Sequence, residues 1–156
     1  MINSRNLSDL DPVARAVCNK HLSLCHLAGI ELIVTSTWRD YESQAALYAI
    51  GRTIQKERLP VTNAKPGHSW HNFKVAWDVV PAIAGKPVWD KKSPLWQEVI
   101  ALGKQAGAEA GADWIKFRDM PHFQIRPLTT LKYSAGVPID LKLAAARWEA
   151  NKTIFV

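Results

Sequence analysis

Hydrophobic residues recur along the chain either at helical spacing or in short β-branched runs. Asp11 followed by Pro12 places a capping side chain before a proline at the first helical position, which predicts a helix over residues 12–28. The apolar residues of this segment repeat at the spacing of one helix face, and Gly29 supplies the stop signal. The Leu-Ile-Val run at 32–34 then predicts a short strand.

The rest of the chain carries further helix and strand signals around one long polar loop. Asp40 can cap a helix over 41–50, and the loop at 52–70 has a length that is often functional. Later elements are expected at 75–80 (strand), 81–88 (turn or hairpin), 93–106 (helix), 114–117 and 122–125 (short strands) and about 140–150 (helix). Helices and short strands without regular alternation predict an α+β fold, with helices packed on a small, mostly antiparallel sheet.

Length and composition restrict the class of protein. The 156 residues are 47% hydrophobic and 22% charged, which suits one domain over residues 1–156 and opposes wholesale disorder. No apolar run approaches the roughly 20 residues that span a bilayer, so no stable membrane insertion is expected. The polar N-terminus lacks the apolar centre of a secretory signal, which predicts synthesis in the cytoplasm. The net charge of +6 favours a polyanionic partner, which is nucleic acid, anionic lipid or anionic cell-wall polymer.

The two cysteines do not form a recognisable motif. Cys18 and Cys25 would lie about 10 Å apart along the first helix, which is beyond the reach of a disulfide. We therefore expect two reduced, buried thiols rather than a zinc pair or a redox motif.

Two histidines and two aspartates stand out in the segments 67–78 and 114–124. Two imidazoles and one carboxylate form a common catalytic zinc set, which leaves the fourth position for water, and a further carboxylate can move the proton of that water. The sequence offers His71, Asp78 and His122 as ligands and Asp119 as base. The seven positions between His71 and Asp78 would point the two side chains to opposite faces of a regular strand, so His71 is expected on a bend before the strand.

Spacing alone leaves other interpretations open for these residues. The two histidines could serve an interface, and Asp78 could be a turn or ion-pair residue. His21 and His26 lie in the first predicted helix and are interpreted as surface or satisfied core histidines, while His68 has no assigned role.

Three short motifs occur in order along residues 32–125. They consist of Ser36, Arg39, Gln44, Leu47, Tyr48, Gly51 and Arg52; then Ser69, His71 and Asp78; then Asp119, Pro121 and His122. Together they resemble the LAS group of zinc peptidases, in its D-alanyl-D-alanine carboxypeptidase branch, and within it the phage endolysins that are L-alanyl-D-glutamate peptidases. One departure is Lys74, which stands where that family usually has glycine; it is expected to alter the turn before Asp78 or to add a cation near the metal.

The resemblance implies a role for each matching residue. His71, Asp78 and His122 would bind one Zn²⁺ ion, and Asp119 would be the general base and acid. Arg39 would contact a substrate carboxylate or the oxyanion, with a structural ion pair to Asp40 or another acid as the alternative. Ser69 would hydrogen-bond substrate or orient the His71 loop. Gln44 and Tyr48 are expected to be structural, as are Trp70, Trp77 and Trp114.

The resemblance also implies a substrate and a setting. The substrate would be bacterial peptidoglycan, cut between L-Ala and D-Glu of the stem peptide by a monomer that binds no nucleic acid. A phage lysis enzyme of this kind is made in the host cytoplasm without a signal peptide and reaches the wall through a holin-type pore. The alternatives are a D-Ala-D-Ala carboxypeptidase with the same catalytic residues and a non-catalytic basic wall-binding module. The stretch 127–156 lies outside the three motifs, and its helix is expected to cover core surface.

Overall fold

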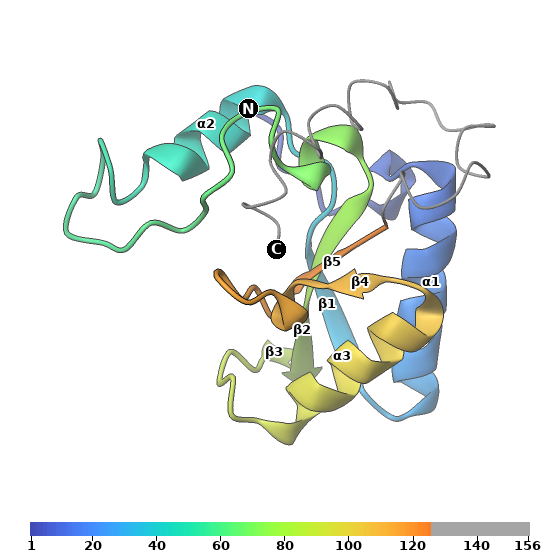
Figure 1. The fold of residues 1–156 in the computed structure, drawn as a ribbon. Coiled ribbons are helices and arrows are strands. Elements are labelled where there is room, and N and C mark those ends of the chain that lie inside the picture. Colours follow the sequence, from blue (N-terminus) through green and yellow to red (C-terminus); the bar gives the residue numbers. More distant parts are fainter. Residues whose placement is uncertain (126–156) are drawn as a thin grey trace.

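Over residues 1–125, the fold combines three α-helices with one small sheet (Figure 1). The computed structural model describes residues 1–125, so the helix expected at about 140–150 lies outside the described residues. The elements are η1 (Leu7–Asp9), α1 (Pro12–Leu27), β1 (Glu31–Ser36), α2 (Tyr41–Ala49), η2 (Trp70–Phe73), β2 (Ala76–Ile83), β3 (Lys86–Pro87), α3 (Pro94–Ala106), β4 (Glu109–Ala110), η3 (Gly111–Asp113) and β5 (His122–Gln124), where η marks a 3-10 helix.

The sheet is antiparallel throughout, which confirms the α+β prediction. Its strands lie in the order β1-β2-β5-β4, and β3 pairs with β2 as a hairpin. The central strand β2 therefore has β1 on one edge and β5 on the other. This arrangement brings segments that are far apart in the sequence next to each other.

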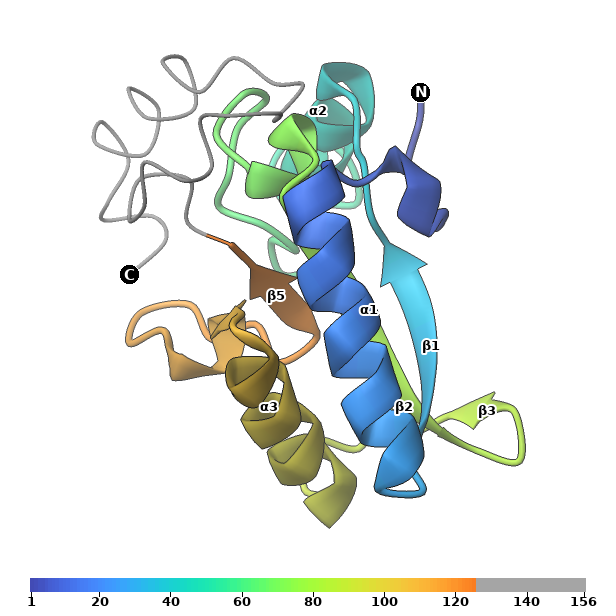
Figure 2. The same ribbon diagram turned by 90° about the vertical axis from the view of Figure 1, so that its right-hand side faces the viewer.

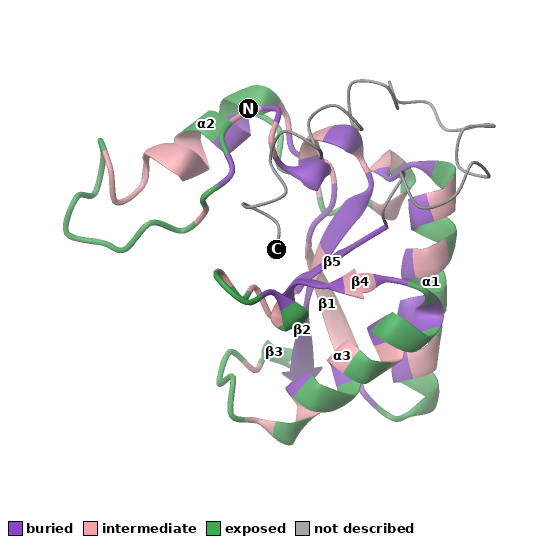
Figure 3. Cartoon of the chain, viewed as in Figure 1, coloured by how far each residue is buried: buried purple, intermediate pink, exposed green. Residues whose placement is uncertain are grey.

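The two longest helices cover one face of the sheet (Figure 2). On that face Trp77 of β2 and Phe123 of β5 stack with ring centroids 6.3 Å apart, and the ring of His21 from α1 lies 4.5 Å from that of Phe123. Gly103 of α3 lets the helix approach Phe123, because a Cβ at this position would stand 2.4 Å from the Phe123 ring. The strands β2 and β5 are mostly buried and β1 is mostly half-buried, while α1 and α3 alternate between buried and exposed residues (Figure 3).

The helix starts follow the capping signals of the sequence. Asp11 accepts hydrogen bonds from the backbone of Val13 and Ala14, and Asp40 accepts one from the backbone N–H of Ser43 at 2.7 Å. At the start of α3, Ser93 makes no side-chain capping bond, and Pro94 occupies the first helical position. Cys18 and Cys25 are free and buried, as expected. Within residues 1–125, no helix combines the length and the apolar character that crossing a membrane requires.

The prediction of a strand at 114–117 is wrong. The strand lies earlier, at β4, and residues 114–117 form an irregular segment after η3. The apolar residues of this segment suggested a strand, but Ile115 is exposed. Both edges of β5 are already occupied, by β2 and by β4, so no edge of β5 remains for the segment to pair with.

Candidate metal centre

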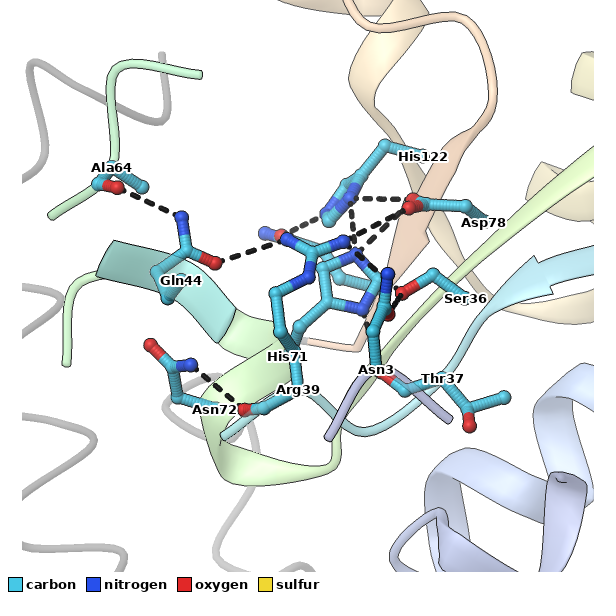
Figure 4. A network of polar contacts seen from close by, with 11 residues as sticks. Asn3, Ser36, Thr37, Arg39, Gln44, Ala64, His71, Asn72, Asp78 and His122 are labelled. Carbon is cyan, nitrogen blue, oxygen red and sulfur yellow. Dashed lines mark hydrogen bonds and ion pairs between the residues drawn. The ribbon is translucent and has the colours of Figure 1, made fainter. Parts of the chain in front are cut away.

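Three side chains expected to bind metal meet at one point in the structure (Figure 4). The distance from His71 Nε2 to Asp78 Oδ1 is 3.1 Å, from His122 Nδ1 to Asp78 Oδ1 is 3.1 Å, and from His71 Nε2 to His122 Nδ1 is 3.2 Å. The imidazoles therefore face one another across the carboxylate.

The sheet places two of these side chains. Asp78 of β2 and His122 of β5 are directly opposite each other in the antiparallel register, so their side chains share one face. Their neighbours Trp77 and Phe123 point to the other face, toward the helices, because successive side chains on a strand alternate. The two strands thus build a core on one side and a polar site on the other.

His71 reaches the site from outside the sheet, which confirms the expected bend. It lies in η2, and Lys74 then adopts a left-handed backbone conformation with φ 64° that turns the chain into β2. Glycine adopts this conformation readily, whereas lysine does so at a cost. The Lys74 ammonium lies over the Trp38 ring, 4.6 Å from its centroid, and Lys74 does not line the cavity at the site. The lysine therefore turns the chain in a backbone conformation that glycine favours.

The hydrogen bonds on the far side of each imidazole determine where its protons lie. His71 Nδ1 donates to the carbonyl of Thr37 at 2.6 Å, which leaves a lone pair on Nε2. His122 Nε2 donates to Gln124 Oε1 at 2.9 Å, which leaves a lone pair on Nδ1. When both rings are neutral, two nitrogen lone pairs and a carboxylate oxygen therefore converge, and such a set of acceptors is suited to a cation.

The spacing of the three atoms fits a zinc ion. Zinc with ligand distances of about 2.0 Å in tetrahedral geometry separates its ligand atoms by roughly 3.3 Å. The distances of 3.1–3.2 Å found here are close to that value. The residues present can therefore supply three ligands at tetrahedral spacing, and all three line the cavity.

Charge at the site is concentrated on Asp78. Burial alone would raise the pKa of Asp78, but the charges and hydrogen bonds of His71 and His122 outweigh it and hold this pKa well below its usual range. Burial lowers the pKa of His71 more than the charge of Asp78 raises it. For His122, the hydrogen bond and charge of Asp78 overcome burial and raise the pKa. Asp78 is thus ionised and faces both imidazoles.

Asp119 lies in the loop before β5 and is held by its backbone. Its N–H donates to the carbonyl of Gly111 at 3.1 Å, and its own carbonyl accepts from the N–H of His122 at 3.2 Å. A Cβ on Gly111 would stand 2.6 Å from the Asp119 carbonyl oxygen, so this approach requires glycine. Burial and then the charge of Asp78 raise the pKa of Asp119, as suits a proton acceptor beside a metal.

Arg39 is buried beside the ligands and makes its ion pair with Asp78 rather than Asp40. Its Nη2 lies 3.6 Å from Asp78 Oδ2 and donates to Ser36 Oγ at 3.1 Å, while Nη1 donates to Gln44 Oε1 at 3.0 Å. The amide nitrogen of Gln44 in turn donates to the carbonyl of Ala64 in the long loop at 2.8 Å. Within residues 1–125 the Nε–H of Arg39 has no partner.

All the expected site residues line one cavity of about 210 Å³. Ser69 is among them and makes no capping hydrogen bond to η2. The expected core tryptophans are buried, and Trp114 also forms cavity wall, with its ring centroid 5.0 Å from that of His122. The lining residues are Arg39, Leu47, Val61, Thr62, Asn63, Ala64, Ser69, His71, Asp78, Trp114, Phe117, Asp119 and His122.

Two partners of the ligands were not anticipated from the sequence. Gln124 has a detectable signal, since it follows His122 by two positions on a strand and so shares its face. The Thr37 contact uses a backbone carbonyl, which has no side-chain signal. The loop of Ala64 is linked to Arg39 through the Gln44 side chain, which donates to the backbone carbonyl of Ala64.

Comparisons with known proteins find a family model and relatives that are described as peptidases. A model of the family described as D-alanyl-D-alanine carboxypeptidase matches residues 62–125. The chain is 32% identical over 128 residues to the peptidoglycan L-alanyl-D-glutamate endopeptidase CwlK of Bacillus subtilis. This alignment covers 77% of this chain and 75% of that protein. It is 30% identical over 125 residues to the L-alanyl-D-glutamate peptidase of Listeria phage A118. This alignment covers 78% of this chain and 41% of that protein.

Solved structures share the fold at lower identity. The L-Ala D-Glu endopeptidase ChiX of Serratia marcescens superposes with a TM-score of 0.59 at 22% identity, covering 81% of this chain and 90% of that one. The L,D-carboxypeptidase DacB of Streptococcus pneumoniae gives a TM-score of 0.53 at 20% identity, covering 84% and 79%. These likenesses confirm the fold class.

Proposed function

Because the chain belongs to the D-alanyl-D-alanine carboxypeptidase family of peptidases, we propose that it is a zinc-dependent peptidoglycan hydrolase that cuts the L-Ala–D-Glu amide of the stem peptide. The observation that carries this proposal is the convergence of three ligand atoms within 3.1–3.2 Å of one another, in a cavity that also holds Asp119. The bond that is cut is inferred from the names of the two curated relatives, both L-alanyl-D-glutamate peptidases.

His71, Asp78 and His122 would hold the metal through Nε2, Oδ1 and Nδ1. A bound zinc ion supplies a Lewis acid and makes hydroxide available from water near neutral pH. The Thr37 carbonyl and Gln124 keep the two imidazoles turned toward the ion.

Asp119 would move the proton. Its raised pKa brings the carboxylate closer to the working pH, so that it can accept a proton from water and return it to the amine that leaves. The backbone bonds to Gly111 and His122 fix its position beside the ligands. The carboxylate therefore acts from a site prepared before substrate arrives.

Arg39 and Ser69 would bind the substrate. Arg39 lines the cavity, and its guanidinium is suited to a carboxylate or to the oxyanion that develops at the scissile carbonyl; D-Glu supplies a free carboxylate. The Ser69 hydroxyl lines the same cavity and is proposed to hydrogen-bond the peptide. All six residues come from one chain, so a monomer is sufficient for this chemistry.

The charge and the phage relative support a role at the bacterial wall. A net charge of +6 speeds encounter with an anionic polymer at low salt. By analogy with the peptidase of Listeria phage A118, we place the protein among phage lysis enzymes that reach the wall through a holin-type pore. Peptidoglycan, rather than nucleic acid, is then the polyanionic partner.

Mass spectrometry of digested peptidoglycan tests the proposal. We expect glycan strands that carry free L-Ala carboxyl ends and peptides that begin with D-Glu, and we expect neither from Asp119→Ala. The family description favours a second candidate, a D-Ala-D-Ala carboxypeptidase, which would release D-Ala instead. Binding to the wall without any product would contradict both enzymes and leave the basic wall-binding module.

A further inference from the structure

The two histidines of the metal centre are held by different kinds of partner. His71 donates to a backbone carbonyl, that of Thr37, at 2.6 Å. His122 donates to a side chain, the amide oxygen of Gln124, at 2.9 Å. The orientation of His71 is therefore fixed by the fold, whereas that of His122 depends on the identity of one residue.

The sheet holds Gln124 in place. It pairs with Ala76 of β2 on one side and with Glu109 of β4 on the other, and its side chain is fully buried. Because Gln124 and His122 are two positions apart on β5, both side chains lie on the face of the metal centre. Its amide nitrogen has no hydrogen-bond partner within residues 1–125, so in this part of the chain only the oxygen is used.

We propose that Gln124 is a positioning residue that fixes the tautomer of His122. While Nε2–H donates to Gln124 Oε1, the lone pair stays on Nδ1, which faces Asp78 Oδ1 at 3.1 Å and His71 Nε2 at 3.2 Å. This inference takes the identity of the metal from the proposed function. The position of the proton on His122 does not depend on the proposed function.

Loss of the amide oxygen would leave another arrangement open to the metal-free protein. The proton can move to His122 Nδ1, where Asp78 Oδ1 at 3.1 Å accepts it. That tautomer keeps a hydrogen bond on the buried ring, so the stability of the metal-free fold should change little. It also puts a hydrogen at the point where the three acceptors meet, so an ion must first displace it.

Zinc affinity separates this role from a purely structural one. Gln124→Met keeps the length of the side chain without the acceptor, and we expect zinc to bind about 10–100-fold more weakly, in competition with a chelator of known affinity. The thermal midpoint of the zinc-free variant should shift by less than about 4 °C. Gln124→Glu restores an acceptor and should restore affinity, and Gln97→Met, on the exposed side of α3, is the matched control that should change neither.

The position of the proton gives an independent result. Nitrogen-15 shifts of His122 in the zinc-free protein, recorded at a pH at which the ring is neutral, should place the proton on Nε2 in the native chain and on Nδ1 in Gln124→Met. A proton on Nδ1 in the native chain, or equal zinc affinity of the native chain and Gln124→Met, would overturn the proposal. If the tautomers differ as expected but no chain binds zinc, the role of Gln124 in fixing the tautomer stands and the proposed function fails.

Discussion

The two faces of the sheet use the same residue type for opposite purposes. On the helix-covered face, His21 donates from Nε2 to the carbonyl of Val99 at 3.0 Å and accepts from Trp77 Nε1–H at 3.4 Å. On the other face, His122 presents a lone pair to the carboxylate of Asp78. Both histidines are buried, so burial does not distinguish them.

The partners of each imidazole make the difference. Burial lowers the pKa of His21 to about 4, and the Trp77 N–H would oppose a second proton on its ring. The charge of Asp78 instead raises the pKa of His122 against the effect of burial. His21 has both a hydrogen-bond donor and an acceptor as partners, as in a structural core residue. His122 directs its lone pair toward a carboxylate, an arrangement that can bind a cation.

The largest effect should come from removing His122. His122→Ala takes away one of the three ligand atoms, so we expect zinc binding and peptidoglycan hydrolysis to be lost together. His21→Gln, on the opposite face, should destabilise the fold but keep one zinc ion per folded chain. Metal analysis of both purified variants decides, and zinc retained by His122→Ala would contradict the assignment of ligands.

Removing Asp119 should separate binding from turnover. Asp119→Ala leaves all three ligands in place, so zinc should remain while hydrolysis falls about 10²–10⁴-fold. Turbidity clearing of a wall suspension measures the rate. Equal clearing by native protein and variant would reject Asp119 as the base.

Crowded glycines on the two faces should respond differently to a methyl group. At Gly111 the new Cβ would stand 2.6 Å from the Asp119 carbonyl oxygen. Gly111→Ala should therefore displace Asp119 and reduce hydrolysis by about 10–100-fold. At Gly103 the Cβ would meet Phe123 in the core, so Gly103→Ala should cost about 1–3 kcal/mol of stability with the activity of folded protein kept. The reverse pattern in assays and denaturation curves would contradict the separation of the two faces.

The core histidine should make the fold sensitive to acid. Its folded pKa of about 4 lies below the ordinary value of 6.5, so its contribution is fully present above pH 6.5 and is lost as the pH falls toward 4. We expect the free energy of unfolding to drop by about 2 kcal/mol more between pH 7 and pH 5 in the native chain than in His21→Gln. Denaturant titrations that give the same change in the free energy of unfolding between pH 7 and pH 5 for the native chain and His21→Gln would show that His21 does not titrate in this way.

The helix starts and the bend at His71 were predictable because their signals are local. Asp11 with Pro12, and Asp40, begin helices by satisfying backbone N–H groups within the next three residues. The odd spacing of His71 and Asp78 predicted a bend, and the structure has one. These inferences needed no knowledge of the rest of the chain.

The remaining errors and omissions depend on contacts between distant segments. Whether residues 114–117 form a strand depends on the edges of β5, and β2 and β4 already occupy them. The link from Gln44 to Ala64 and the bond from His71 to Thr37 end on backbone carbonyls, which every residue carries. Such contacts become visible only when the fold is known.

Anomalous scattering at the zinc edge from crystals grown with zinc tests the central claim most directly. We predict one ion, with His71 Nε2, Asp78 Oδ1 and His122 Nδ1 each at about 2.0–2.2 Å. A map without an ion at this point, or imidazoles turned away from each other, would contradict the metal centre and the enzyme mechanism built on it.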